Sequence, residues 1–149
     1  MTNNNYQIRN ATMEDVTGIM ELSNQLGYPS SQFEIQERLE SILHSNDHSI
    51  FVAYAPENKV IGWIHAYKRM SIESGFFAEI GGFVVSKSFR KKGIGRDLLK
   101  SIEQWTLQKN LPMLRVRSQI QREGAKRFYT NMRFTITKRQ RVFDKMMRN

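Results

Sequence analysis

A pair of adjacent glycines, Gly81 and Gly82, interrupts an apolar, strand-like stretch in the middle of the chain, FFAEIGGFVVS at residues 76–86. The aromatic and β-branched residues of this stretch favour a β-strand. Glycine inside a strand weakens it, and it commonly marks a bulge or a close approach of the backbone to another group. We therefore expect a bulged strand inside a sheet, and this irregularity limits the folds that the chain can adopt.

Hydrophobic spacing and turn signals divide the rest of the chain into strands and helices. Strands are expected at residues 6–12, 49–55, 60–69, 76–86 and 113–118, with a last strand or bent hairpin at 134–147. Helices are expected after a capping box of Thr12 and Asp15, after Ser31, from the loop at Gly93 to about Asn110, and at residues 122–132. This order predicts an α+β fold of α/β-like character, with helices packed on a mixed sheet.

The composition predicts one globular domain spanning residues 1–149. Hydrophobic residues make up 40% of the 149 residues, and no linker-like segment interrupts them, so a core of ordinary size can form. There is no cysteine, no signal peptide and no apolar run of about 18 residues. We therefore expect a soluble, cytoplasmic protein with no membrane contact. The formal net charge of +9 favours an anionic ligand.

Positive charge and glycine are concentrated just before a predicted helix, in the stretch SFRKKGIGRDLL. Arg90, Lys91 and Lys92 precede Gly93 and Gly95. A helix N-terminus leaves about four backbone N–H groups without helical partners and carries partial positive charge. Glycine lets the backbone approach a ligand closely. These features favour a phosphate or pyrophosphate site, and a solvated basic turn is the alternative.

The pattern R-x-x-G-x-G after a bulged strand resembles the signature of the GNAT superfamily of acyl-CoA-dependent N-acyltransferases. The matching stretch is VVSKSFRKKGIGRDLL, and the order of elements and the later segment AKRFYTNMRF are also similar to the family. The resemblance implies a central twisted, mixed and mostly antiparallel sheet with a bulged, splayed central strand and about four flanking helices. It also implies acetyl-CoA as the co-substrate and no metal.

By the same resemblance, the cofactor would lie along the bulged strand and the loop that follows it. The pantetheine arm would run beside Phe83, Val84 and Val85. The backbone and basic side chains of the loop would bind the pyrophosphate. The loop residues concerned are Arg90, Lys91, Lys92, Gly93, Ile94, Gly95 and Arg96.

Acetyl transfer to an amine needs one group that takes the amine's proton and one that gives a proton to the departing thiolate. Glu79 is the candidate base, since its stretch is similar to the one that carries the catalytic glutamate in the family's histone acetyltransferases. The alternative for Glu79 is a carboxylate paired with an arginine or lysine. Tyr129 is the candidate acid, because family members have a tyrosine there near the CoA sulfur and a phenol is a neutral donor. The alternative for Tyr129 is a core aromatic side chain.

Two residues near Tyr129 depart from the family pattern. Arg122 stands where asparagine is usual, and Arg133 stands where glycine is usual. These departures leave open a non-catalytic, CoA-binding protein. The three histidines have no metal-ligand spacing, so no metal site is predicted.

The acceptor amine is expected to enter beside the first two helices. Glu21, Glu34 and Glu37 in that region would suit a small cationic amine, either an aminoglycoside-like amino sugar or a polyamine. A protein or peptide amine is the alternative. The positive charge also fits a nucleic-acid-binding module, but that interpretation leaves the bulged strand and the R-x-x-G-x-G loop unexplained. A homodimer is compatible with the family resemblance.

Overall fold

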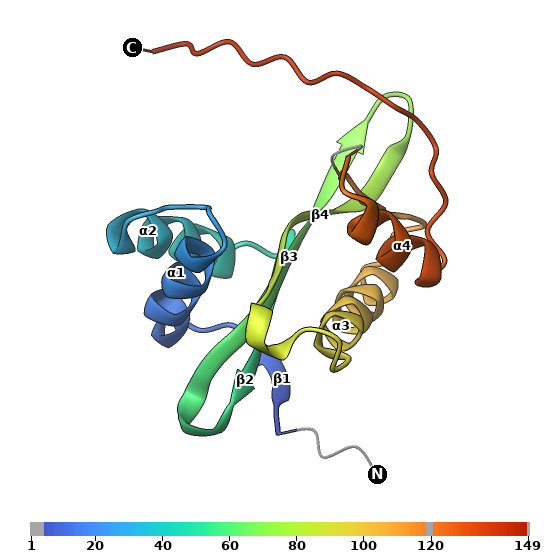
Figure 1. Cartoon of the computed structure of the whole chain (residues 1–149). Coiled ribbons are helices and arrows are strands. Elements are labelled where there is room, and N and C mark those ends of the chain that lie inside the picture. The colour runs from blue at the N-terminus through green and yellow to red at the C-terminus, as the bar shows by residue number, and fades with distance from the viewer. Residues whose placement is uncertain (1–4, 119–120, 149) are drawn as a thin grey trace. The chain divides into compact units, whose positions relative to one another are not determined.

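The computed structural model describes residues 5–118 and 121–148 and shows five strands and four α-helices in this part of the chain (Figure 1). The elements are β1 (Gln7–Asn10), α1 (Val16–Gln25), α2 (Gln32–Leu43), β2 (His48–Ala55), β3 (Lys59–Ser71), β4 (Gly75–Val85), α3 (Ile94–Gln108), β5 (Leu114–Val116) and α4 (Glu123–Asn131). The chain divides into two compact units, Met1–Val116 and Arg117–Asn149. Among the described helices, none combines the length and apolarity needed to cross a membrane.

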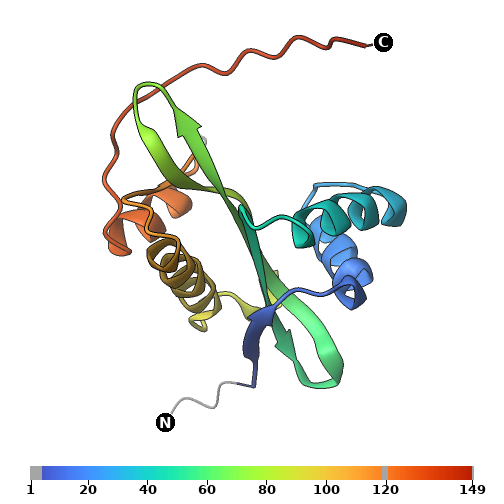
Figure 2. The same ribbon diagram turned by 180° about the vertical axis from the view of Figure 1, so that it is seen from behind.

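The first unit contains one sheet with the strand order β1-β2-β3-β4-β5. The pairings from β1 through β4 are antiparallel, and β5 joins β4 in parallel. Helices α1 and α2 cover one face of this sheet, and α3 covers the other (Figures 1 and 2). The predicted α+β fold with a mixed, mostly antiparallel sheet is therefore confirmed.

The start of α1 is fixed by a buried carboxylate. Asp15 is 3% exposed, and it accepts hydrogen bonds from the Thr12 backbone N–H at 2.8 Å and from the Arg9 guanidinium at 2.7 and 2.9 Å. The Thr12 hydroxyl accepts from the Glu14 backbone N–H in return. The predicted capping box is confirmed, and Arg9 supplies the charge partner that a buried carboxylate needs.

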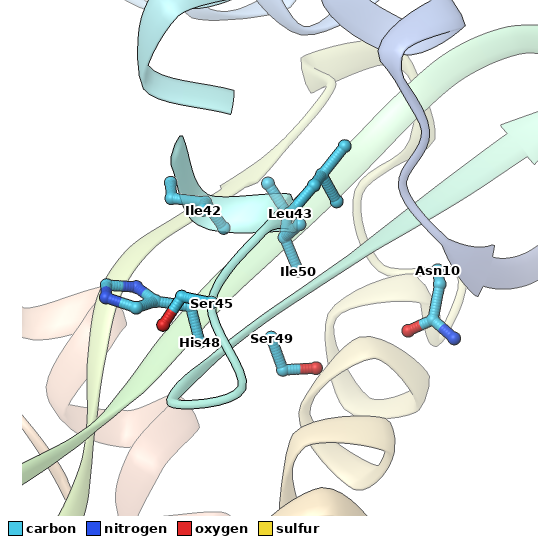
Figure 3. A pocket seen from close by; sticks show the side chains of 7 residues that line it. All are labelled: Asn10, Ile42, Leu43, Ser45, His48, Ser49 and Ile50. Carbon is cyan, nitrogen blue, oxygen red and sulfur yellow. The ribbon is translucent and has the colours of Figure 1, made fainter. Parts of the chain in front are cut away.

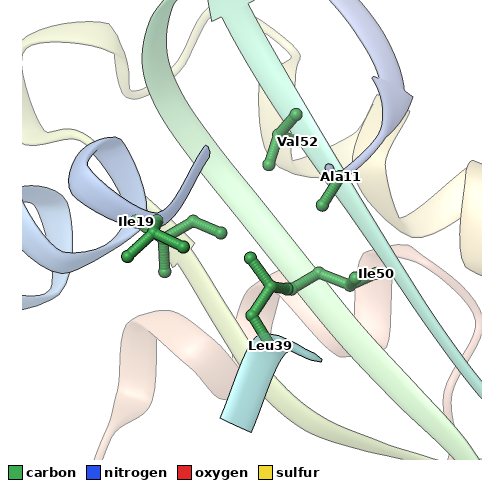
Figure 4. Packing of buried hydrophobic residues seen from close by; sticks show 6 residues of the cluster. Ala11, Ile19, Leu39, Ile50 and Val52 are labelled. Carbon is green, nitrogen blue, oxygen red and sulfur yellow. The ribbon is translucent and has the colours of Figure 1, made fainter. Parts of the chain in front are cut away.

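Each face of the sheet buries its own apolar layer. On the α1 and α2 face, a cluster of buried hydrophobic side chains packs between the helices and β2 (Figure 4). On the other face, α3 lies so close to β3 that a β-carbon at Gly62 would stand 3.1 Å from Leu98 and 3.3 Å from Ile94. Burying one such aliphatic side chain contributes about 1.5–3 kcal/mol. The α1-face cluster is Ala11, Val16, Ile19, Leu39, Ile50 and Val52.

The glycine pair forms the predicted bulge in β4. His65 of β3 lies opposite Gly82, whereas the next residue, Ala66, lies opposite Ile80, so Gly81 is an extra residue on β4. Its β-carbon would stand 3.0 Å from both the His65 and the Tyr67 ring. Both glycines face ring side chains of β3, because a β-carbon on Gly82 would stand only 2.6 Å from the Trp63 ring.

The bulge also changes which residues of β4 share a face. Cross-strand partners point their side chains to the same side of a sheet. Before the bulge, Glu79 pairs with Tyr67 on the α1 and α2 face. After it, Phe83 pairs with Ile64, and Val85 pairs with Gly62, which packs against α3. Phe83 and Val85 thus lie on the face opposite Glu79.

The second unit contains α4 and the C-terminal segment. Arg133, just beyond α4, has a φ of 70°, and the backbone N–H of Phe134 donates to the Tyr129 carbonyl at 2.9 Å. This left-handed residue closes the helix as glycine commonly does, although arginine occupies the position.

The strand or hairpin predicted at residues 134–147 is wrong. Residues 134–148 are assigned to neither strand nor helix, and the side chains of Ile136, Val142 and Phe143 are 63–85% exposed. A strand requires a hydrogen-bonded neighbour and an apolar face to bury. The run Lys138–Arg141, which contains three basic residues, separates the apolar residues of this segment.

We expect Gly82→Ala to lower the free energy of unfolding by about 1–3 kcal/mol, because the added methyl group would overlap the Trp63 ring. Urea denaturation measures this effect. In a double-mutant cycle, the cost of Gly82→Ala should be much smaller in a Trp63→Leu background. An equal cost in both backgrounds would show that Trp63 is not the cause.

Candidate active site

No side chain caps the N-terminus of α3, in contrast to that of α2. Helix α2 begins at Ser31, whose hydroxyl accepts from the Glu34 N–H at 3.1 Å while the Glu34 carboxylate accepts from the Ser31 N–H at 2.9 Å. Helix α3 instead begins at Gly93, which has a φ of 88° and offers no side chain to its first turn. The first backbone N–H groups of α3 are thus available to an anionic ligand.

The loop before α3 is exposed, basic and partly left-handed. Lys91 has a φ of 63°, and the side chains of Arg90, Lys91 and Lys92 are exposed. The ammonium of Lys92 lies 5.2 Å from the centre of the Phe89 ring. The side chain of Ile94 is only 1% exposed, so it belongs to the core and could contribute only backbone to a ligand.

The one acidic residue in the first turn of α3 is held by two partners. The Tyr6 hydroxyl donates a hydrogen bond to the Asp97 carboxylate, and Nε of Arg96 lies 3.6 Å from it. Burial and the contact with Asp97 raise the pKa of Tyr6 to about 12, so Tyr6 stays a hydrogen-bond donor at neutral pH. Asp97 thus offsets the charge of Arg96, and Arg90, Lys91 and Lys92 remain as exposed positive charges of the loop.

Strand β4 continues beyond its last pair with β5. The parallel register joins Ala78, Glu79 and Ile80 to β5, whereas β4 itself extends to Val85. The segment from Gly81 to Val85 includes Phe83, Val84 and Val85, which were predicted to lie beside the pantetheine arm. It leads through a short turn into the basic loop.

Glu79 is buried and ion-paired. It is 5% exposed, and its carboxylate accepts two 3.0 Å contacts from Nη1 of Arg69 and a 2.9 Å hydrogen bond from the Tyr67 hydroxyl. The sequence left open a base or a paired carboxylate, and the structure shows the pairing. The pairing does not prevent Glu79 from receiving a proton, and it does not test that function. Its role as a base therefore stays a prediction.

Tyr129 lies in α4, in the second unit. Its ring makes edge-on contacts with Phe128 and Phe134, with centroids 5.3 and 5.4 Å apart. Burial raises the pKa of Tyr129, and the positive charge of Arg122 partly opposes that shift. The phenol therefore keeps its proton at neutral pH, as an acid requires, and its catalytic role stays a prediction.

Sequence reasoning missed a pair of histidines beside Glu79. Nδ1 of His48 lies 2.9 Å from Nε2 of His65, and the rings stack with centroids 5.1 Å apart. Tyr67 packs against both rings. Burial, together with the charge of His48, lowers the pKa of His65 to about 4. No linear spacing could reveal this pair, because its members meet only through the register of β2 and β3.

His48 also borders a pocket of about 200 Å³ beside the C-terminal end of α2 and the start of β2 (Figure 3). The pocket combines aliphatic side chains with hydroxyl, amide and imidazole groups. Its lining residues are Asn10, Ile42, Leu43, Ser45, His48, Ser49 and Ile50.

The acidic residues predicted to face the acceptor are not equivalent. Glu34 belongs to the capping box of α2 and also pairs with Arg38 at 3.4 Å. Hydrogen bonds from Ser31 lower its pKa. Glu21 and Glu37 have exposed side chains. Glu34 is thus committed to its own helix, and Glu21 and Glu37 are better placed to receive a cation.

A family model for the acetyltransferase (GNAT) family matches residues 13–134. The chain belongs to this family. It is therefore a GNAT N-acetyltransferase. Acetyltransferases of this family use acetyl-CoA.

Sequence and structure comparisons agree with this assignment. The uncharacterized N-acetyltransferase YhdJ of Bacillus subtilis (strain 168) is 34% identical over 102 residues, which cover 67% of this chain and 70% of that protein. The aminoglycoside 6'-N-acetyltransferase AAC(6')-Ih of Acinetobacter baumannii superposes with a TM-score of 0.82 at 16% identity, over 95% of this chain and 99% of that one. AAC(6')-Iy, solved with a CoA-containing bisubstrate analogue, gives 0.84 at 19% identity, over 95% and 98%. At these identities the two structures support the fold.

The lowered pKa of His65 predicts a pH dependence of stability. Between about pH 6.5 and 4 the unfolded chain binds a proton at His65 that the folded chain does not, so the free energy of unfolding falls as the pH falls through this window. His65→Gln should reduce that fall by up to about 3 kcal/mol. Denaturant unfolding at a series of pH values measures it, with His44→Gln, at the exposed end of α2, as the control. Parallel pH profiles for wild type and His65→Gln would contradict the assignment.

Proposed function

We propose that this GNAT enzyme transfers the acetyl group of acetyl-CoA directly to the primary amine of a small cationic acceptor. The observation that carries the proposal is the uncapped N-terminus of α3, which follows the bulged strand and a basic, partly left-handed loop. Helix dipole, open N–H groups and lysine and arginine charge all favour a pyrophosphate at this place.

In this proposal, the backbone N–H groups from Lys91 to Arg96 wrap the pyrophosphate of CoA. Arg90, Lys91 and Lys92 supply formal positive charge around it. The pantetheine arm runs beside Phe83, Val84 and Val85, where β4 extends beyond its pairs with β5. This arrangement would bring the thioester to the bulge.

The chemistry needs no covalent enzyme intermediate. Glu79 takes a proton from the acceptor amine, directly or through water, and the amine nitrogen attacks the thioester carbonyl. A backbone N–H near Val84 or Val85 stabilises the oxyanion. The C–S bond then breaks, Tyr129 gives its proton to the sulfur, and the second proton lost by the nitrogen returns to the Tyr129 phenolate.

The acceptor is proposed to be an aminoglycoside-like amino sugar or a polyamine. The exposed carboxylates of Glu21 and Glu37 favour a cation at the helical side of the sheet. The similarity in fold to aminoglycoside acetyltransferases supports the same class. A peptide amine is the alternative, and an amine screen with spermidine, glucosamine, kanamycin and a lysine-containing peptide separates them.

Isothermal titration should show that wild type binds acetyl-CoA and that a Gly93→Trp, Gly95→Trp double variant does not. The added side chains would occupy the space of the pyrophosphate. Gly75→Trp is the matched control, because Gly75 also has a positive φ, of 70°, but stands in open space at the start of β4. Circular dichroism checks that each variant is folded.

Each other outcome of this titration has a definite meaning. Equal binding by wild type and the double variant would place the cofactor elsewhere. No binding by wild type, with salt-sensitive binding to random oligonucleotides, would favour a nucleic-acid module. Binding of acetyl-CoA without acetylation of any amine would indicate a non-catalytic CoA-binding protein.

We expect Tyr129→Phe to lower kcat by roughly 10²-fold while the Kd of acetyl-CoA stays nearly unchanged, because only the proton donor is removed. Steady-state assays with the fastest-reacting amine measure kcat. Tyr28→Phe, at a tyrosine that is 57% exposed, is the control and should behave as wild type. A Tyr129→Phe enzyme with wild-type kcat would rule out this tyrosine as the acid.

A further inference from the structure

The histidine pair connects the bulge of β4 with the pocket beside α2. Nδ1 of His65 points at the bulge, since a β-carbon on Gly81 would stand 3.0 Å from it. The other ring nitrogen, Nε2, lies 2.9 Å from Nδ1 of His48. His48 in turn lines the pocket shown in Figure 3. Two imidazoles in series thus lead from β3, in the middle of the sheet, to the pocket beside the start of β2.

Acetylation of a cationic amine must dispose of one proton in each turnover. An ammonium and acetyl-CoA yield an amide, the CoA thiol and one free proton. A neutral amine and acetyl-CoA yield the same products with no proton to spare. The need for a proton outlet therefore depends on whether the amine arrives charged, and most alkyl amines are charged at pH 7.

Glu79 is poorly placed to release a proton by itself. Its side chain is 7% exposed, and its carboxylate already accepts from Arg69 and Tyr67. On the same face, Tyr67 lies opposite Glu79 and packs against both imidazole rings. Glu79 and His65 are thus diagonal neighbours on adjacent strands, and their side chains lie on the same face of the sheet.

We propose that His65 and His48 form a relay that carries this proton from the bulge to the pocket; the proposal rests on the acetyl transfer proposed above. Nδ1 of His65 accepts the proton that Glu79, or a water bound to it, has taken from the amine. His65 then gives the proton on Nε2 to Nδ1 of His48. His48 releases its Nε2 proton to water in the pocket, which leaves both rings neutral with the proton on Nδ1. Each ring returns to its Nε2-protonated tautomer before the next turnover.

The surroundings of the pair favour outward transfer. The titratable groups near it are Tyr67 on β3, Glu79 on β4 with its partner Arg69, and Asp47, which precedes His48 in the chain. Helix α2 contributes Ile42 and Leu43 to the pocket, and neither titrates. Burial disfavours a lasting charge on His65, so this ring passes a proton on instead of keeping it.

The test compares His65→Gln and His48→Gln with His44→Gln, which changes the remaining histidine of the chain, exposed at the end of α2. Glutamine is polar but cannot accept a proton at one atom and release one at another. Turnover of the fastest-reacting of spermidine, glucosamine and kanamycin is measured from about pH 6 to about pH 11.5, a range that passes the pKa of about 10.4 of a lysine-like amine. The Kd of acetyl-CoA is measured for every variant.

We expect both relay variants to lose roughly 10-fold or more in kcat at neutral pH with an unchanged Kd for acetyl-CoA. The loss should shrink to about twofold or less above the pKa of the amine, where the acceptor enters neutral. Added imidazole should restore part of the activity at neutral pH, and His44→Gln should match wild type throughout.

A loss of equal size at every pH would indicate that the rings only support packing, and it would overturn the relay while leaving acetyl transfer intact. Wild-type rates in His65→Gln and His48→Gln would overturn it as well. Failure of the wild-type chain to bind acetyl-CoA would instead overturn the proposed function and the relay together.

Discussion

Gly81 and Gly82 of β4 lie directly against the rings of Trp63, His65 and Tyr67, at distances that leave no room for a β-carbon at Gly82. The extra residue shifts the register with β3 and so reverses the alternation of β4. Upstream of the bulge, β4 presents Glu79 to the α1 and α2 side. Downstream, Phe83 and Val85 lie on the α3 side, and the strand leads into the basic loop. One local irregularity therefore separates the proposed acceptor chemistry from the proposed cofactor site.

Electrostatics distinguishes the two sides of the bulge. On the acceptor side, the buried carboxylates Asp15 and Glu79 each have an arginine partner, as charges removed from water require. On the cofactor side, Asp97 is held by Tyr6 and Arg96, and the first turn of α3 has no side-chain cap. Both sides thus contain internal ion pairs, and the second also has the exposed side chains of Arg90, Lys91 and Lys92.

Much of the fold could be predicted because local signals agreed with the tertiary structure. The glycine pair marked the bulge, Thr12 and Asp15 marked the first helix, and hydrophobic periodicity placed the remaining helices within a few residues of their observed bounds. The strand predicted at residues 134–147 failed because β-structure depends on a partner that the segment itself does not encode. The sequence of residues 134–147 alone could not show whether such a partner strand exists.

The candidate site was predictable to a smaller degree. The R-x-x-G-x-G loop could be recognised because its residues are contiguous, and the structure gives it an uncapped helix start. The partners of Glu79 and the pairing of His48 with His65 could not, because each depends on strand register. A second bulge, between Ala53 and Tyr54, shifts the register of β2 with β3 by one residue. Counting residues from the turn between these strands would therefore have misplaced the contact of His48 with His65.

The central claim is that the bulged strand and the start of α3 together bind the coenzyme. Titration of ¹⁵N-labelled protein with CoA, followed by the backbone amide signals, tests it residue by residue. The account predicts that the largest shifts fall on the amides of residues 91–96 and 83–85, with small changes in α2 and in the turn between β3 and β4. Shifts concentrated elsewhere, or none at saturating CoA, would contradict it.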